Sequence, residues 1–79
     1  MKRGDVVIAK AGKEKGGLFV VTQVLDPKYV LIADGNHRPL EKPKKKNTTH
    51  LKRTNQTIGE IESNRQLRIL LRAFIEEVK

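Results

Sequence analysis

The sequence contains no cysteine and no tryptophan, and only one tyrosine and two phenylalanines in 79 residues. The absence of cysteine excludes disulfide bonds and thiolate metal sites, and it fits a reducing compartment such as the cytoplasm. No apolar stretch approaches the roughly 20 residues of a membrane-spanning helix. No signal peptide is recognisable after Met1. We therefore expect one cytoplasmic domain without a membrane partner.

The shortage of aromatic side chains narrows the classes of ligand. Stacking platforms for single-stranded bases, cages for methylated side chains and grooves for proline-rich peptides all need aromatic walls. Catalytic and metal-binding patterns are also missing. Residues 11–17 lack the spacing of a P-loop, and the two histidines, His37 and His50, lack metal-ligand spacing. We expect a protein that is not an enzyme and that binds no metal or other cofactor.

Positive charge is what the chain has in excess. Lysine and arginine total 17 against 9 acidic residues, which gives a formal net charge of +8. Residues 1–54 contain 13 basic and 5 acidic residues, whereas residues 55–79 contain 4 of each. A concentrated basic surface attracts polyanions, because binding releases their condensed counterions. The sequence therefore predicts a polyanion-binding unit in residues 1–54, followed by a segment of different character.

Apolar and β-branched residues predict three β-strands, at residues 5–10, 17–26 and 29–33. The apolar residues of the second strand alternate onto both faces, with Val20 on one face and Val21 on the other. A strand with two apolar faces is typically buried on both sides. One face would fill the interior of a small barrel and the other would lie under the C-terminal helix. The sequence does not decide which face is which.

Short connections join these strands. Residues 11–17 contain three glycines and two lysines, and we expect Gly16, which ends this loop, to need positive φ or a close backbone contact. Asp26-Pro27 matches the first two positions of a type I turn. Asp34-Gly35 is a strong hairpin signal. Strands spaced so closely favour a small barrel over an open sheet.

The pattern of apolar strands and turn residues becomes weaker after residue 35. Residues 39–41 (Pro-Leu-Glu) predict a short edge strand, because proline cannot donate to a ladder interior. Residues 47–53 predict a fifth strand that closes the barrel. The three lysines at 44–46 would then lie in a loop between strands. Such runs are usually solvated and mobile, but the position of this one within the barrel favours contact with phosphate.

Residues 55–79 have helical character. The spacing of a capping box occurs at residues 57–60 and again at 63–66. These signals predict a short helical turn near 57–62 and a main helix over 64–78.

One stripe of the main helix is apolar and includes Leu67, Leu71 and Phe74. This stripe would cover the barrel or form a layer of its core. Ile69 and Ile75 widen the stripe, so a second interpretation stays open: the helix binds a protein partner or a second copy of the chain.

Several segments of the chain together resemble a KOW motif: Gly4-Asp5, residues 6–8, Gly12, Lys15-Gly16 and residues 20–24. Residues 1–54 as a whole, including 29–35 and 41–47, resemble a family of single-KOW RNA-binding proteins. That family is related to the large-subunit ribosomal protein fourteen-e. The resemblance implies a mostly β fold, a five-stranded SH3-like barrel that contacts RNA in ribosomes or transcription complexes. It would place a KOW barrel in residues 1–54 and a helical segment packed on it in residues 55–79.

Charge and resemblance together predict a non-catalytic module that binds structured, ribosomal-type RNA. With few aromatic residues, it would contact phosphates and read shape more than base sequence. The alternative is a protein-interaction module like the KOW or SH3-like domains of transcription and translation complexes. The candidate RNA-binding residues are Lys13, Lys15, Gly16, Arg38, Lys44, Lys45, Lys46, His50, Lys52 and Arg53.

Overall fold

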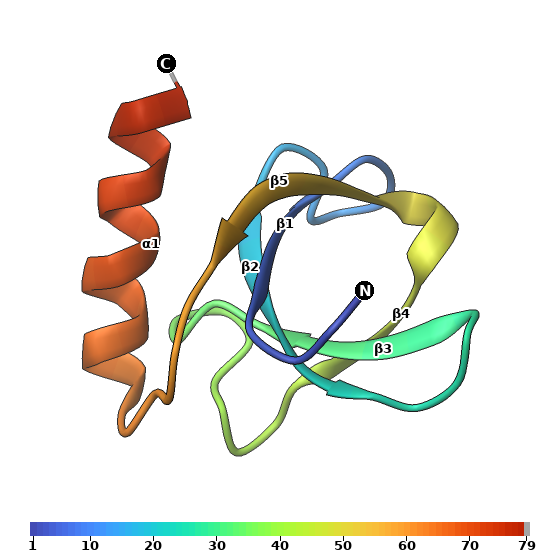
Figure 1. Ribbon diagram of the computed structural model, residues 1–79, viewed down its shortest axis with the longest axis horizontal. Coiled ribbons are helices and arrows are strands. Elements are labelled where there is room, and N and C mark those ends of the chain that lie inside the picture. Colours follow the sequence, from blue (N-terminus) through green and yellow to red (C-terminus); the bar gives the residue numbers. More distant parts are fainter. Residues whose placement is uncertain (79) are drawn as a thin grey trace.

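The computed structural model describes the backbone of residues 1–78 and the side chains of residues 1–74. Five strands are followed by one helix, and the strands bend around a common interior while the helix stands outside them (Figure 1). The elements are β1 (Asp5–Ala9), β2 (Leu18–Val24), β3 (Tyr29–Ala33), β4 (Lys44–Asn47), the 3-10 turn η1 (Thr48–His50), β5 (Leu51–Thr57) and α1 (Asn64–Val78). The prediction of a mostly β fold with a C-terminal helix is confirmed.

All strand pairs are antiparallel, and the order across the sheet is β4-β3-β2-β1-β5. The ladder is an open sheet with β4 and β5 at its edges, so strand pairing alone does not close the barrel that the sequence predicted. Two irregularities increase its bending. The register of β2 against β3 shifts between Val21 and Gln23, and that of β1 against β5 shifts between Asp5 and Val7.

The two faces of the sheet carry separate apolar clusters. The inner cluster contains Val7, Ala9, Phe19, Val21, Val30, Ile32 and Leu51, with Met1 packed against it. The outer cluster contains Val6, Leu18, Val20, Ala33, Leu67 and Leu71. The face of β2 that carries Val21 therefore points inward, and the face that carries Val20 lies under the helix. Burial ends at the bulge, because Val24 and Leu25 are exposed.

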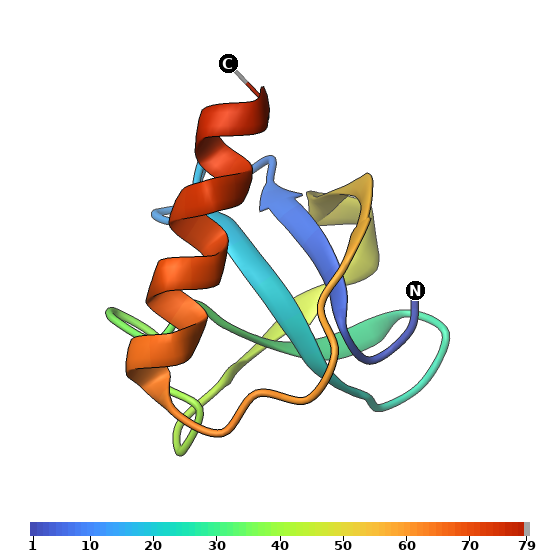
Figure 2. The ribbon, with the colours of Figure 1, turned by 60° about the vertical axis from the view of Figure 1, so that its left-hand side comes forward.

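Helix α1 lies across β2 on the outer face of the sheet (Figure 2). Leu67 is fully buried and Leu71 nearly so, and Phe74 packs at the edge of the same cluster. Ile69 points away from the sheet and is 60% exposed. The predicted contribution of Ile75 lies outside the described side chains. The apolar stripe thus covers the sheet, as the first of the two interpretations predicted.

The N-terminus of α1 is fixed to residues 34–43. The Asn64 side chain accepts a hydrogen bond from the Leu40 amide (2.7 Å) and donates one to Glu41 Oε1 (2.7 Å). Arg68 Nη1 donates to the carbonyl oxygen of Gly35 (2.7 Å). Gly35 has φ of +80°, and a Cβ there would lie 2.5 Å from the carbonyl oxygen of Asn64. Only glycine fits this backbone conformation and this close approach.

The second capping signal is confirmed with one change. The Gln66 amide donates to Ser63 Oγ (3.1 Å), as in a capping box. The Gln66 side chain accepts from the amide of Glu62 (2.7 Å) and not from that of Ser63. The cap fixes the start of α1 at the predicted residue.

Three local predictions are wrong. Residues 39–41 form a turn and not a strand, because the Lys42 amide donates to the Pro39 carbonyl. Residues 58–63 contain no regular structure, so the helical turn near 57–62 is absent. The fifth strand is Leu51–Thr57, displaced from the predicted 47–53, since η1 and the end of β4 occupy the intervening residues and Thr57 pairs with Asp5.

Candidate nucleic-acid interface

The loop over residues 10–17 joins β1 to β2 and carries the first group of predicted site residues. Its base is closed by hydrogen bonds from the Gly16 amide to the Ala9 carbonyl (2.8 Å) and from the Ala9 amide to the Gly17 carbonyl (3.0 Å). Gly16 has φ of +87°, which confirms the predicted positive φ. No atom lies within 4 Å of the position of a Cβ at Gly16, so the alternative reason, a close backbone contact, does not apply.

Replacing Gly16 by valine is expected to destabilise the fold by about 1–3 kcal/mol through backbone strain alone. Gly59 supplies a matched control, because it also has open space around it but has no positive φ. Gly59→Val should change the free energy of unfolding by less than about 0.5 kcal/mol. Urea unfolding of both variants measures the difference, and equal stabilities would contradict the role given to Gly16.

Glu14, in the middle of this loop, is the centre of a cluster of charged side chains. Its Oε1 accepts hydrogen bonds from Arg38 Nη2 (2.9 Å) and is 2.8 Å from Lys44 Nζ. Its Oε2 lies 3.7 Å from Lys46 Nζ. The Glu14 side chain is only 9% exposed. One carboxylate therefore holds three cations from the 34–43 loop and from β4, and the cluster keeps an excess of positive charge.

The Lys44 hydrogen bond is the main reason why the pKa of Glu14 falls from its ordinary 4.5 to about 2. Burial acts in the opposite direction, and the Arg38 hydrogen bond adds to the lowering. Glu14 is thus ionised at neutral pH, which keeps the three cations in place.

The three lysines at 44–46 belong to strand β4 and not to the predicted loop. Cross-strand pairing places Lys44 beside Ile32 and Lys46 beside Val30, on the inner face. The Lys46 side chain is 9% exposed, and its Nζ also donates to the Ala11 carbonyl (3.2 Å). Lys46 is therefore neither a solvated residue nor part of a loop that reaches out to phosphate, because its side chain is a buried part of the fold.

Lys45 points to the opposite face of β4. Its Nζ lies 4.6 Å from the centre of the Tyr29 ring, in a cation–π geometry. Adjacent lysines on one strand thus have different environments, because successive side chains of a strand point to opposite faces.

A groove of about 440 Å³ opens between the 10–17 loop and the 34–43 loop. Its lining residues are Lys13, Glu14, Lys15, Gly17, Phe19, Asp34, His37 and Arg38. Neither Lys13 nor Lys15 forms an ion pair with any side chain that the structure describes. The groove brings together three of the ten predicted site residues, Lys13, Lys15 and Arg38, and Arg38 joins it to the Glu14 cluster.

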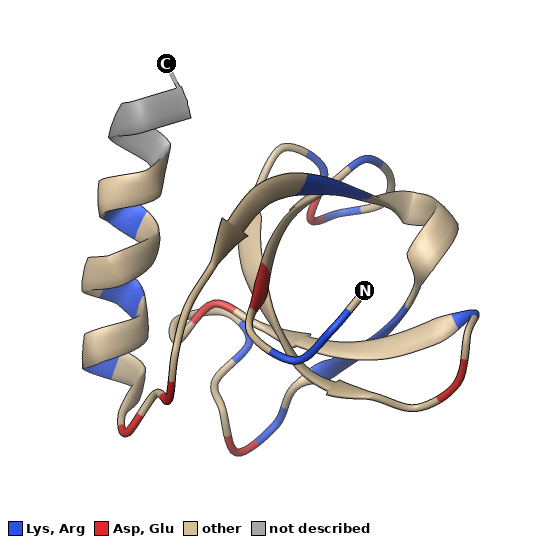
Figure 3. Ribbon diagram, in the orientation of Figure 1, with Lys and Arg blue, Asp and Glu red and all other residues tan. Residues whose placement is uncertain are grey.

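The remaining predicted residues lie on η1 and β5. His50 is exposed in η1, and its carbonyl accepts from the Lys10 amide (2.7 Å). Lys52 pairs with Ile8 and Arg53 with Val7, so their side chains start from opposite faces of β5. Within residues 1–74, no side-chain bond connects these three to the Glu14 cluster. Figure 3 shows basic residues on the loops, on the edge strands and along α1.

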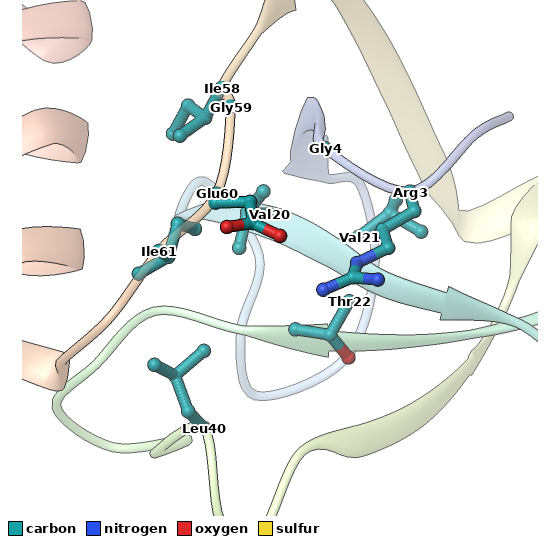
Figure 4. A pocket seen from close by; sticks show the side chains of 10 residues that line it. All are labelled: Arg3, Gly4, Val20, Val21, Thr22, Leu40, Ile58, Gly59, Glu60 and Ile61. Carbon is teal, nitrogen blue, oxygen red and sulfur yellow. The ribbon is translucent and has the colours of Figure 1, made fainter.

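A second hollow, of about 340 Å³, lies between β2 and the segment that precedes α1 (Figure 4). Val20, Leu40, Ile58 and Ile61 contribute apolar walls, and Arg3 and Glu60 add one charge of each sign.

Glu14 was not among the predicted site residues. The prediction selected basic residues as phosphate ligands, and Glu14 is the one acid between Lys13 and Lys15. Its partners lie 24 to 32 residues away in the chain, so no local spacing could have indicated the cluster.

No helix within residues 1–78 has the length and apolar character needed to cross a membrane. Comparison with known proteins gives no match, either to a protein-family model or to a curated protein.

Proposed function

We propose that this chain is a non-catalytic RNA-binding module that contacts structured RNA through its phosphates. The observation that supports this most is the gathering of basic side chains from three separate segments around the groove beside Glu14. Phosphate contacts of this kind position a protein on a nucleic acid without reading its sequence. The KOW resemblance adds a ribosomal-type RNA as the expected target.

The arrangement of the strands fits an SH3-like barrel of the KOW type, which we propose as the finer description of the fold. Five antiparallel strands bend around one apolar cluster, and a 3-10 turn precedes the last strand. That turn is bonded to two other connections: the Lys10 amide donates to the His50 carbonyl, and the Thr48 amide donates to the Lys28 carbonyl. These bonds continue the β3–β4 and β1–β5 pairings up to the turn, and the turn itself joins the two edge strands, β4 and β5, in the chain.

The alternative function, a protein-interaction module, is favoured by the hollow next to β2, whose apolar walls carry one charge of each sign. One observation separates the two proposals. An RNA-binding module purified at low salt should carry nucleic acid, seen as raised absorbance at 260 nm that high salt removes. A preparation free of nucleic acid, with no affinity for RNA at low salt, would favour the protein-interaction module.

A salt titration with charge-matched variants tests the RNA-binding surface. Replacing Lys13 and Lys15 with glutamine should make the plot of log affinity against log salt shallower by about 1.5 units, since each phosphate contact accounts for about 0.7–0.9. The control replaces Arg65 and Arg72, two exposed residues of α1, and removes the same charge. Its slope should stay close to that of the wild type. Equal slopes for the two double variants would contradict the proposed surface.

A further inference from the structure

The groove beside Glu14 has the features of a site for a single phosphate group. We propose that it binds one backbone phosphate of RNA, with Arg38 as the main ligand, Lys13 and Lys15 on the rim, and Glu14 as the residue that positions Arg38. This inference rests on the proposed RNA-binding function and assigns its central contact.

Both the backbone and the guanidinium group of Arg38 are held by hydrogen bonds. Its amide donates to Asp34 Oδ1 (2.8 Å), and its carbonyl accepts from the amides of Asp34 (2.9 Å) and Gly35 (3.1 Å). Its guanidinium donates to Glu14 Oε1 through Nη2 (2.9 Å). The side chain nevertheless stays 36% exposed and lines the groove. A phosphate that binds it would therefore not have to immobilise a free side chain first.

The chemistry of the guanidinium allows two acceptors at once. Arginine has five N–H donors in a planar fork, and Glu14 uses only one side of it. The remaining donors match the spacing of two phosphate oxygens. A lysine ammonium carries its charge at one point, so it could not keep Glu14 and present a second planar pair of donors in the same way.

The local charge favours an anion despite the presence of carboxylates. Glu14 is shared among Arg38, Lys44 and Lys46, and Lys13 and Lys15 add two further positive charges on the rim. The other carboxylate of the groove, Asp34, already accepts two backbone N–H bonds through Oδ1, and its Oδ2 lies 4.0 Å from His37 Nδ1.

The shape of the groove also fits a nucleotide chain. A volume of about 440 Å³ exceeds what a phosphate group alone requires and leaves room for an attached sugar. Gly17 and Phe19 form an apolar part of the lining, and a Cβ at Gly17 would lie 3.0 Å from the Phe19 ring. The absence of a side chain at position 17 therefore keeps this wall open.

The test compares three variants on one short RNA hairpin with a 5′-hydroxyl, by fluorescence anisotropy at fixed salt. Arg38→Gln should weaken binding about tenfold, which is typical of the loss of a hydrogen bond to a charged group. Arg38→Lys keeps the charge but loses the fork, and it should weaken binding about threefold or more. Arg72→Gln removes the same charge from an exposed position on α1 and should cost less than about twofold. Melting temperatures confirm that each variant is folded.

Several outcomes would overturn the inference. If Arg38→Gln and Arg72→Gln bind equally well, the groove is not the phosphate site, although RNA binding itself stands. If Arg38→Lys binds like the wild type, Arg38 acts only through its charge and not as a fork. If the wild type binds no RNA at low salt, both this inference and the proposed function fail.

A second arm distinguishes a backbone phosphate from a terminal or free one. The same hairpin with a 5′-phosphate should bind with the affinity of the 5′-hydroxyl form, and a clear preference for the 5′-phosphate would overturn the backbone assignment. Titration with inorganic phosphate, followed by amide NMR, should shift residues 13–17 and Arg38 only weakly. Saturation by micromolar inorganic phosphate would identify a free-anion site instead.

Discussion

Removing residues 63–79 is expected to unfold the protein. The deletion takes away Leu67 and Leu71 and uncovers Val20 and Ala33 on the outer face of the sheet. Each large apolar side chain that loses full burial costs roughly 1.5–3 kcal/mol. A domain of this size has only about 5–15 kcal/mol of stability in total. The loss of the helix should therefore consume most of that stability, and the fragment over residues 1–62 should give an NMR spectrum with collapsed amide dispersion.

Single substitutions in α1 test the same role of the helix, because a buried and an exposed residue can be compared. Leu67→Ala should lower the free energy of unfolding by about 2–5 kcal/mol, because Leu67 is fully buried. Ile69 lies two residues away on the same helix and is 60% exposed, so Ile69→Ala should change it by less than about 0.5 kcal/mol. A 1–62 fragment that stays folded and monomeric would instead identify α1 as an element that binds a partner.

The helix could be predicted because its signals are local. The apolar period of 3.6 residues and the Ser63 cap both lie within the segment itself, and the helix begins where they indicate. The signals for the tight turn at Asp26 are local as well, since Asp26 Oδ1 accepts hydrogen bonds from the amides of Lys28 and Tyr29.

The faces of β2 could not be assigned from sequence, because both are apolar over residues 18–21. The register of β2 against β3 determines which face points inward, and the bulge at Thr22 then interrupts the alternation of inward and outward side chains. Val24 and Leu25, which the pattern placed in buried rows, are exposed because Val24 ends β2 and Leu25 lies in the turn to β3. A bulge depends on the partner strand, so the sequence of one strand does not reveal it.

Strand β4 was missed because three consecutive lysines have low β propensity and lysine is rarely buried. Its strand conformation comes from pairing with β3, and the burial of Lys46 comes from Glu14 and the Ala11 carbonyl. These partners lie more than 30 residues earlier in the chain. The sequence therefore could not separate the lysines of β4 by environment: Lys46 is buried in the fold, and Lys45 faces away from the groove.

Replacing Glu14 with glutamine is expected to have the second large effect on stability. Three cations lose their shared counter-charge, and the nearly buried Lys46 ammonium is left with the Ala11 carbonyl and no carboxylate beside it. Removal of one member of a largely buried charge cluster should cost about 2–3 kcal/mol. Glu60, an exposed acid outside any described ion pair, supplies the control, and Glu60→Gln should stay within about 0.5 kcal/mol of wild type.

The pH dependence of this difference identifies its electrostatic origin. The pKa of Glu14 is about 2 in the folded protein and 4.5 without its partners, so its contribution to stability is fully present above pH 4.5. As the pH falls from 4.5 towards 2, the wild type loses this contribution, whereas Glu14→Gln has none to lose. The gap in unfolding free energy between the two proteins should therefore narrow across this range, as measured by urea unfolding at a series of pH values. A gap that stays constant would mean that Glu14 stabilises the fold through packing and not through its charge.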